Sequence, residues 1–422
     1  MQVIENTKLK EKLYKEKLEN GLTIMIIPKK GIQKKYIIWG TNYGSNDNNF
    51  LVLGDKNNTE VPNGVAHFLE HKMFEQRNGT NSLDVLTALG VNANAYTTNE
   101  HTAYLYECTN NFYEALDEFM DYVQNPYFTD ENVEKEKGII AQEIGMYDDS
   151  PDWQVYLNCM KAMYHTNPIK IDIAGTVESI SKIDKEILYK CYNSFYHPSN
   201  MAMVVAGDFE PEKIFEEIKK RIIWKKDSIN VKRIVEKEEE SIVKNKIVKK
   251  QNVSKPIFTI GIKDKLEEGN IIKKHIAMEI LLDLILGKSS KLYKELYEDG
   301  IIYGRPSLDY EFGRNYAHVL ISGQSKNPEE FDKRFKEKIK EIKKTGINKK
   351  DFSRIKKKSY GGYVREFDDV QDVARIFLSD YFKGINSFDY LEEIESINVE
   401  YLEQLLKDVF KEEKMVISIV KN

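Results

Sequence analysis

The stretch Gly64-Val-Ala-His-Phe-Leu-Glu-His-Lys-Met-Phe-Glu75 is the most informative part of the 422-residue sequence. Apolar residues recur in it at spacings of three and four, which is typical of an amphipathic helix: Val65, Phe68, Leu69 and Met73. On such a helix His67 and His71 lie one turn apart and point the same way. Two imidazoles in that arrangement can bind one Zn²⁺ ion.

Glu70 directly precedes the second histidine, which gives the order His-x-x-Glu-His. This order is the inverse of the commoner zinc-peptidase motif, in which the glutamate follows the first histidine. A carboxylate beside the metal is suited to act as a general base. The alternative is an ordinary helix that carries two histidines on one face.

A zinc peptidase site needs a third protein ligand, and two glutamates downstream are candidates. Glu136 and Glu143 are seven residues apart, which is two turns along one helix face. Isoleucines at 139, 140 and 144 surround Glu143 and favour it as the ligand. Glu136 lies in a charged run, where it either holds a ligand histidine through its other ring nitrogen or is a solvated helix charge.

Composition excludes several classes of protein. The chain has 63 basic and 68 acidic side chains, so it lacks the basic excess of a protein that binds nucleic acid or a membrane surface. Its 41% hydrophobic content is enough for a large core. No apolar run approaches the roughly 20 residues of a membrane span. The charged N-terminal stretch does not read as a secretion signal, so we expect a cytoplasmic protein with three reduced cysteines.

The two halves of the chain look duplicated, because four segments recur in the same order between 214 and 219 residues later. Strand-like 102–108 matches 316–322, and each is followed by an asparagine expected to cap a helix, Asn111 and Asn327. Charged helical segments at 129–137 and 182–188 match 348–356 and 396–402. Coincidental alternation of strands and helices is the alternative explanation.

His67-x-x-Glu70-His71 followed by Glu136 and Glu143 resembles the pitrilysin family of inverted zinc peptidases, which includes insulysin and the mitochondrial processing peptidase. The sequences of residues 136–143 and 173–180 are similar to those of the bacterial YmfH-type zinc subunits of that family. The resemblance covers nearly the whole chain. It implies an α+β fold with two homologous domains, each a largely antiparallel β-sheet packed by α-helices. The expected ranges are 1–225 for the zinc domain, 226–250 for a charged linker and edge strand, and 251–422 for the second domain.

The resemblance also implies a function. It predicts a zinc-dependent endopeptidase with one Zn²⁺ per chain, held by His67, His71 and Glu143, with Glu136 behind a ligand histidine. Glu70 would activate a zinc-bound water. Asn94 and Ala95 belong to a segment similar to the family's substrate-binding edge strand. The expected substrates are unfolded or short peptides, as in processing or leader-peptide removal.

The second half departs from the family pattern. Active members place an Arg and a Tyr there, seven residues apart, to hold the substrate carbonyl. In this sequence Tyr297 stands where the Arg is expected, and Tyr303 follows after six residues. Tyr303 either keeps the family's substrate-binding role or belongs to the core. The resemblance therefore implies a catalytic subunit paired with an inactive homologue that supplies the Arg and Tyr, or a homodimer. A non-catalytic core or peptide-binding subunit is the alternative function.

Overall fold

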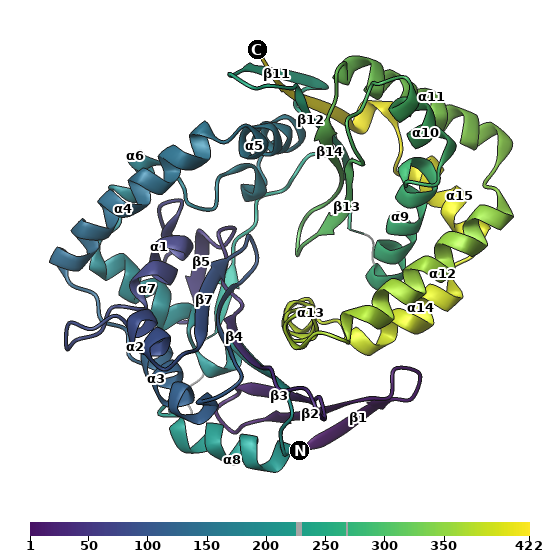
Figure 1. Ribbon diagram of the computed structural model, residues 1–422. Coiled ribbons are helices and arrows are strands. Elements are labelled where there is room, and N and C mark those ends of the chain that lie inside the picture. Colours follow the sequence, from purple (N-terminus) through teal and green to yellow (C-terminus); the bar gives the residue numbers. More distant parts are fainter. Residues whose placement is uncertain (225–229, 267–268) are drawn as a thin grey trace. The chain divides into compact units, whose positions relative to one another are not determined.

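The computed structural model describes residues 1–224, 230–266 and 269–422 (Figure 1). These residues form two compact units, each a mixed α and β structure, as the sequence predicts. Unit 1 contains 1–144, 172–235 and 364–387, and unit 2 contains 145–171, 236–363 and 388–422. The boundary expected at 225 and 226 lies outside the described residues.

Unit 1 is built on a seven-stranded sheet in the order β1-β2-β3-β9-β4-β8-β7. The strands are β1 (Gln2–Asn6), β2 (Glu11–Lys17), β3 (Thr23–Pro28), β4 (Lys35–Thr41), β7 (Asn92–Thr97), β8 (Thr102–Cys108) and β9 (Met201–Gly207). Among the described strands of this sheet, β3 and β9 pair in parallel and the other neighbours pair antiparallel. A small second sheet joins β5 (Asn49–Val52), β6 (Thr59–Glu60) and β10 (Val231–Arg233). Strand β7 is an edge of the large sheet.

Helices cover both faces of the large sheet of unit 1. They are α1 (Val65–Lys72), α2 (Ser82–Ala88), α3 (Phe112–Gln124), α6 (Val177–Ile180), α7 (Lys185–Phe195), α8 (Pro211–Arg221) and α13 (Val370–Phe382). Helix α1 contacts β7 and β8, whereas α13 packs on β4 and β9. A long helix, α4 (Asp130–Asp149), begins in unit 1 and ends in unit 2.

Unit 2 has a five-stranded sheet in the order β11-β15-β12-β14-β13. Its strands are β11 (Lys246–Lys250), β12 (Ile257–Asp264), β13 (Ser307–Phe312), β14 (Ala317–Gln324) and β15 (Met415–Lys421). Its helices are α5 (Pro151–Met163), α9 (Ile271–Leu286), α10 (Lys291–Glu298), α11 (Pro328–Thr345), α12 (Lys349–Glu366, which ends in unit 1), α14 (Tyr390–Ser396) and α15 (Val399–Asp408). Among the described helices, none has the length and apolar character that a membrane span requires.

The two sheets repeat one topology. The order β3-β9-β4-β8-β7 in unit 1 corresponds to β11-β15-β12-β14-β13 in unit 2. In each set the first pair is parallel and the next three are antiparallel. The duplicated segments of the sequence therefore correspond to duplicated strands and helices in space.

The units are not contiguous in the sequence, because the two halves exchange a helix. Helix α5 follows the strands of the first half but packs on β12 and β15 of unit 2. Helix α13 belongs to the second half but packs on β4 and β9 of unit 1. The compact units thus differ from the contiguous ranges 1–225 and 251–422, since burial of each sheet face depends on a helix distant in sequence.

A glycine permits each exchanged helix to approach its sheet closely. A β-carbon added to Gly40 of β4 would lie 2.9 Å from side-chain carbons of Leu378 and Phe382 on α13. One added to Gly261 of β12 would lie 2.7 Å from the sulfur of Cys159 on α5 and still closer to Met163. A glycine therefore stands under the exchanged helix in both units, on β4 in unit 1 and on the corresponding strand β12 in unit 2.

Helix caps show where local sequence rules hold. Asn327 caps α11 by accepting a hydrogen bond from the backbone N–H of Glu330, as predicted. The prediction for Asn111 is wrong, because this residue adopts φ 58° and its side chain donates to the carbonyl of Leu89 instead. A tertiary contact outcompetes the local cap at that position.

We predict that Gly261→Val destabilises the protein, because the added carbons collide with α5. Overpacking of this kind typically costs about 1–3 kcal/mol. Gly361→Ala in α12 is the control, since a β-carbon there meets no atom of the described residues within 4 Å and removes only backbone freedom. Urea unfolding followed by circular dichroism measures both. Equal stability of Gly261→Val and the parent would contradict close packing of α5 on β12.

Candidate metal centre

Helix α1 brings the two motif histidines together. Gly64 precedes it with φ 92°, and a β-carbon at that position would lie 2.9 Å from the carbonyl carbon of Ala174. Glycine is thus required where the helix begins. The rings of His67 and His71 lie on one face with centroids 4.5 Å apart. The spacing of four residues therefore places both imidazoles side by side, as predicted.

Helix α4 brings Glu143 to the two imidazoles. Nε2 of His67 lies 3.7 Å from Oε1 of Glu143, and Nε2 of His71 lies 3.5 Å from Oε2. One nitrogen of each histidine and one oxygen of Glu143 all lie within 4.8 Å of one another. Within 1–224, 230–266 and 269–422, this is the one group of three such side chains with that geometry.

The surroundings of the two glutamates differ from the expectation. Ile140 and Ile144 are buried beside Glu143, but Ile139 is 47% exposed, so that part of the prediction is wrong. Glu136 is 6% exposed, and the alternative that it is a solvated helix charge is wrong as well. The charged sequence around Glu136 conceals that this position faces inward on α4.

Glu136 contacts the far side of His71. Its Oε1 lies 3.1 Å from Nδ1 of His71, the ring nitrogen opposite the one that faces Glu143. A hydrogen bond there orients the ring and directs Nε2 toward Glu143. Burial opposes ionisation of Glu136, but the bonds from His71 and Lys72 outweigh it and hold the pKa of Glu136 below its ordinary value.

The two histidines have different acid–base properties. Burial, together with the neighbouring His71, lowers the pKa of His67 to about 4, so this imidazole is neutral at physiological pH. Burial would also lower the pKa of His71, but the hydrogen bond to Glu136 and the nearby carboxylates raise it overall. Neutral imidazole is the form that binds a metal ion.

Glu70 lies beside this cluster in a buried position. The hydroxyl of Thr97, at the end of β7, donates to Oε2 of Glu70 over 2.9 Å. Burial raises the pKa of Glu70 despite that bond, so its carboxyl group binds a proton more readily than an exposed glutamate. The contact also links α1 to the edge strand that contains Asn94 and Ala95.

Two groups of the centre are not evident from the sequence. Lys72 is fully buried and pairs with Glu75 at 2.7 Å and with Glu136 at 3.5 Å. In the sequence alone, a lysine beside a histidine would be taken for an exposed surface residue. For Thr97 the sequence indicates a position in a strand but not the contact with Glu70. The spacing of three between Lys72 and Glu75 is the one local signal for that ion pair.

The residues predicted from the second half lie in unit 2. Tyr297, at the end of α10, is 55% exposed, and Tyr303 is 44% exposed with the ammonium group of Lys255 4.0 Å from its ring centre. Positions 280–286 lie on α9, about 214 residues after the two histidines, and so correspond to them in the duplicated half. They include Asp283, which pairs with Lys358 at 2.7 Å and Arg305 at 3.4 Å. An ion-pair cluster therefore occupies the corresponding helix in unit 2.

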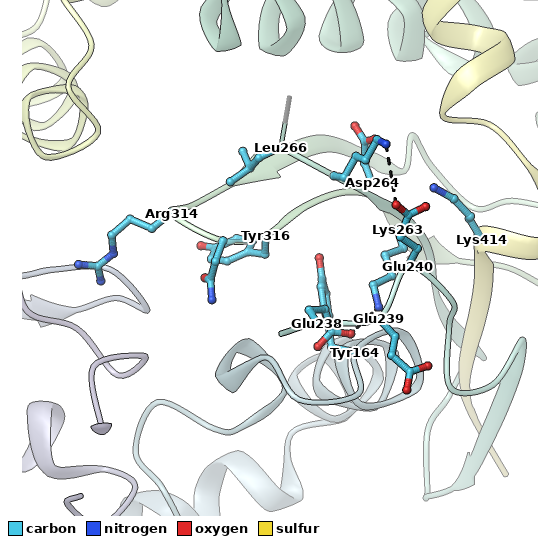
Figure 2. A pocket seen from close by; sticks show the side chains of 12 residues that line it. Tyr164, Glu238, Glu239, Glu240, Lys263, Asp264, Leu266, Arg314, Tyr316 and Lys414 are labelled. Carbon is cyan, nitrogen blue, oxygen red and sulfur yellow. Dashed lines mark hydrogen bonds and ion pairs between the residues drawn. The ribbon is translucent and has the colours of Figure 1, made fainter. Parts of the chain in front are cut away.

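Unit 2 also contains a cavity of about 380 Å³ with strongly charged walls (Figure 2). Several of these charges are paired. Glu238 binds Lys263 at 2.5 Å and accepts the backbone N–H groups of residues 165, 166 and 167. Asp264 accepts a hydrogen bond from Tyr310 and pairs with Lys274. These contacts join β12 to the turn after α5 and to α9, so they have a structural role.

Comparison with known proteins identifies the family. A family model described as Insulinase (Peptidase family M16) matches residues 51–177, and one described as Peptidase M16 inactive domain matches residues 182–359. The uncharacterised zinc protease YmfH of Bacillus subtilis is 37% identical over 419 residues, which are 98% of this chain and 97% of that protein.

Solved structures agree with the sequence comparison. The crystal structure of an M16-like peptidase from Alicyclobacillus acidocaldarius matches with a TM-score of 0.94 and 32% identity over 99% of this chain and 100% of that one. A protease from Helicobacter pylori shares the fold, with a TM-score of 0.85 and 20% identity over 98% of this chain and 100% of that one. The resemblance predicted from the sequence is confirmed: the chain belongs to the insulinase family of zinc proteases, peptidase family M16.

Proposed function

We propose that this protein is a zinc-dependent endopeptidase that cleaves unfolded or short peptides. One observation carries the proposal. His67, His71 and Glu143 have the geometry of a metal site, and the buried Glu70 lies beside them. Glu70 is on α1, the helix that contacts the edge strand β7. The family membership supports a peptidase, and the names of its relatives support zinc.

The donor set fits zinc. Two imidazoles and one carboxylate, with a fourth position left for water, are the ligands of catalytic zinc in several peptidases. His67 and His71 direct Nε2 toward Glu143, and Glu136 fixes the ring of His71. One Zn²⁺ ion per chain, when bound there, would supply Lewis-acid activation of the peptide carbonyl and of water.

Glu70 is assigned the proton transfers. Thr97 binds Oε2 of Glu70, so we assign the transfers to Oε1. In peptide hydrolysis this carboxylate takes a proton from the attacking water and then gives it to the leaving amine. The raised pKa of Glu70 suits both steps, because a carboxylate of ordinary pKa is a weaker base.

Strand β7 is assigned the binding of substrate backbone. It is the last strand of its sheet, with Asn94 exposed and Ala95 half-buried. An extended peptide can add to such an edge through main-chain hydrogen bonds. Because Thr97 of β7 touches Glu70, an added peptide passes next to the proposed base. Only segments without stable structure of their own can bind in this way.

We predict that Glu70→Gln retains zinc and lowers the rate of peptide hydrolysis by about 10²- to 10⁴-fold, the usual contribution of a general base. Mass spectrometry of a mixture of unfolded peptides measures cleavage, and elemental analysis measures zinc. His67→Ala serves as the comparison, because it should lose both zinc and cleavage. Unchanged turnover by Glu70→Gln would contradict the assignment of the base.

We further predict that Glu136→Gln weakens zinc binding by about 10- to 100-fold, because the ring of His71 loses its charged partner. Glu134→Gln is the matched control, since Glu134 lies on the same helix, is exposed and pairs with Lys137 at the surface. Competition with a chelator gives both affinities. Equal zinc affinity in the two variants would show that Glu136 does not support the metal site.

We also propose that the chain works as the zinc-bearing subunit of a pair. Tyr297 replaces the expected arginine, so we assign the group that stabilises the substrate oxyanion to another chain. We predict that a purified homologue lacking the His-x-x-Glu-His motif but retaining that Arg and Tyr raises turnover, by about 10²- to 10³-fold if it supplies an oxyanion ligand. Full activity of the isolated chain, verified as monomeric by light scattering, would refute the pairing.

A further inference from the structure

Helix α13 brings an arginine from the second half of the chain to the proposed substrate strand. Nε of Arg375 donates to the hydroxyl of Tyr36 on β4 over 3.0 Å. The guanidinium carbon lies 5.3 Å from the ring centre of Tyr96 on β7. Tyr96 directly precedes Thr97, whose hydroxyl binds Glu70. Arg375 therefore lies one strand position from the contact that links β7 to the metal centre.

The sheet register shows which face Arg375 occupies. Residues directly opposite each other in antiparallel strands point to the same face, and successive residues alternate. Tyr96 is opposite Ala103, and Ala103 is opposite Gly40, the glycine against which α13 packs. Tyr96 and Arg375 thus lie on the α13 face, whereas Thr97 points to the α1 face with Glu70.

A peptide paired with β7 would follow the same alternation. One of its side chains would lie opposite Tyr96 on the α13 face, at the short distance typical of cross-strand neighbours. The next side chain would lie opposite Thr97, on the α1 face beside the proposed base. Because the two positions are adjacent, the side chain that meets the α13 face belongs to a residue next to the reacting part of the peptide.

The charge of Arg375 is not balanced by an ion pair. Across the described ranges, no carboxylate lies within 4 Å of its guanidinium group, and its direct contacts are the hydroxyl of Tyr36 and the ring of Tyr96. Asp372, three residues earlier on α13, attracts the guanidinium group from a longer distance. Glu107 points to the same face but already pairs with Lys34 at 3.2 Å and accepts from Asn92. The terminal N–H groups of Arg375 are therefore available to an acidic ligand.

We propose that Arg375 determines specificity by selecting an acidic residue, Asp or Glu, at the substrate position opposite Tyr96. The proposal rests on the proposed peptidase function and adds to it a preference at one position. Tyr36 and Tyr96 hold the guanidinium group, and a carboxylate of the peptide accepts its remaining hydrogen bonds. Such charge-assisted, bidentate contacts favour arginine over lysine.

Matched peptides test this specificity. The peptides are unfolded and share one cleavage site. Each pair differs at a single position near that site, with Glu in one peptide and Gln in the other, and kcat/KM is measured for both. We expect Glu to be preferred about tenfold or more at one position, the usual effect of a hydrogen bond between charged groups. Arg375→Gln should abolish that preference, and Arg375→Glu should replace it with a preference for Lys. Arg365→Gln, at an exposed arginine of α12, should leave it unchanged.

Binding measurements separate this inference from the proposed function. The same peptides, labelled with a fluorophore, are titrated against zinc-loaded Glu70→Gln with and without Arg375→Gln. A Glu preference that depends on Arg375 supports the inference even where the parent shows no cleavage. Cleavage by the parent with equal kcat/KM for Glu and Gln at all positions overturns the inference and leaves the peptidase intact. A Glu preference retained by Arg375→Gln overturns it too, because another group would then be responsible.

Discussion

Alternation of side chains along β7 is the constraint on which the proposed site depends. Thr97 points to α1, where its hydroxyl binds Glu70, and Tyr96 points to α13, where its ring faces Arg375. A strand cannot direct neighbouring residues to one face. A bound peptide would therefore present one side chain to the helix that carries the proposed base and the next to the helix proposed to select it.

The exchange of α5 and α13 explains why Arg375, the residue proposed to select the substrate, is so far in sequence from the His-x-x-Glu-His motif. Each sheet leaves an apolar face that one helix from the other half covers, and Gly40 and Gly261 allow the close approach. Neither half alone completes a core, because a fragment ending near residue 225 lacks the helix that covers β4 and β9. The core of each unit therefore contains residues from both halves of the chain.

The sequence predicts the parts of this structure that depend on local spacing. The helix around His67, the two turns between Glu136 and Glu143, and the order of the duplicated segments are all periodic features. Burial of Lys72 and the position of Arg375 depend on contacts between elements far apart in sequence, which periodicity does not report. Asn111 illustrates the same limit, since a long-range bond to Leu89 replaces the expected cap.

The second unit shows how the same helix pair is held without metal ligands. In unit 1, His67 and His71 on α1 face Glu143 on α4, so a bound cation would join the two helices. In unit 2, Asp283 on α9 pairs with Lys358 on α12, the helix that corresponds to α4. The lysine contributes the positive charge that the metal would supply in unit 1. Because Lys358 is part of the chain, an ion pair between their own side chains joins these two helices of unit 2.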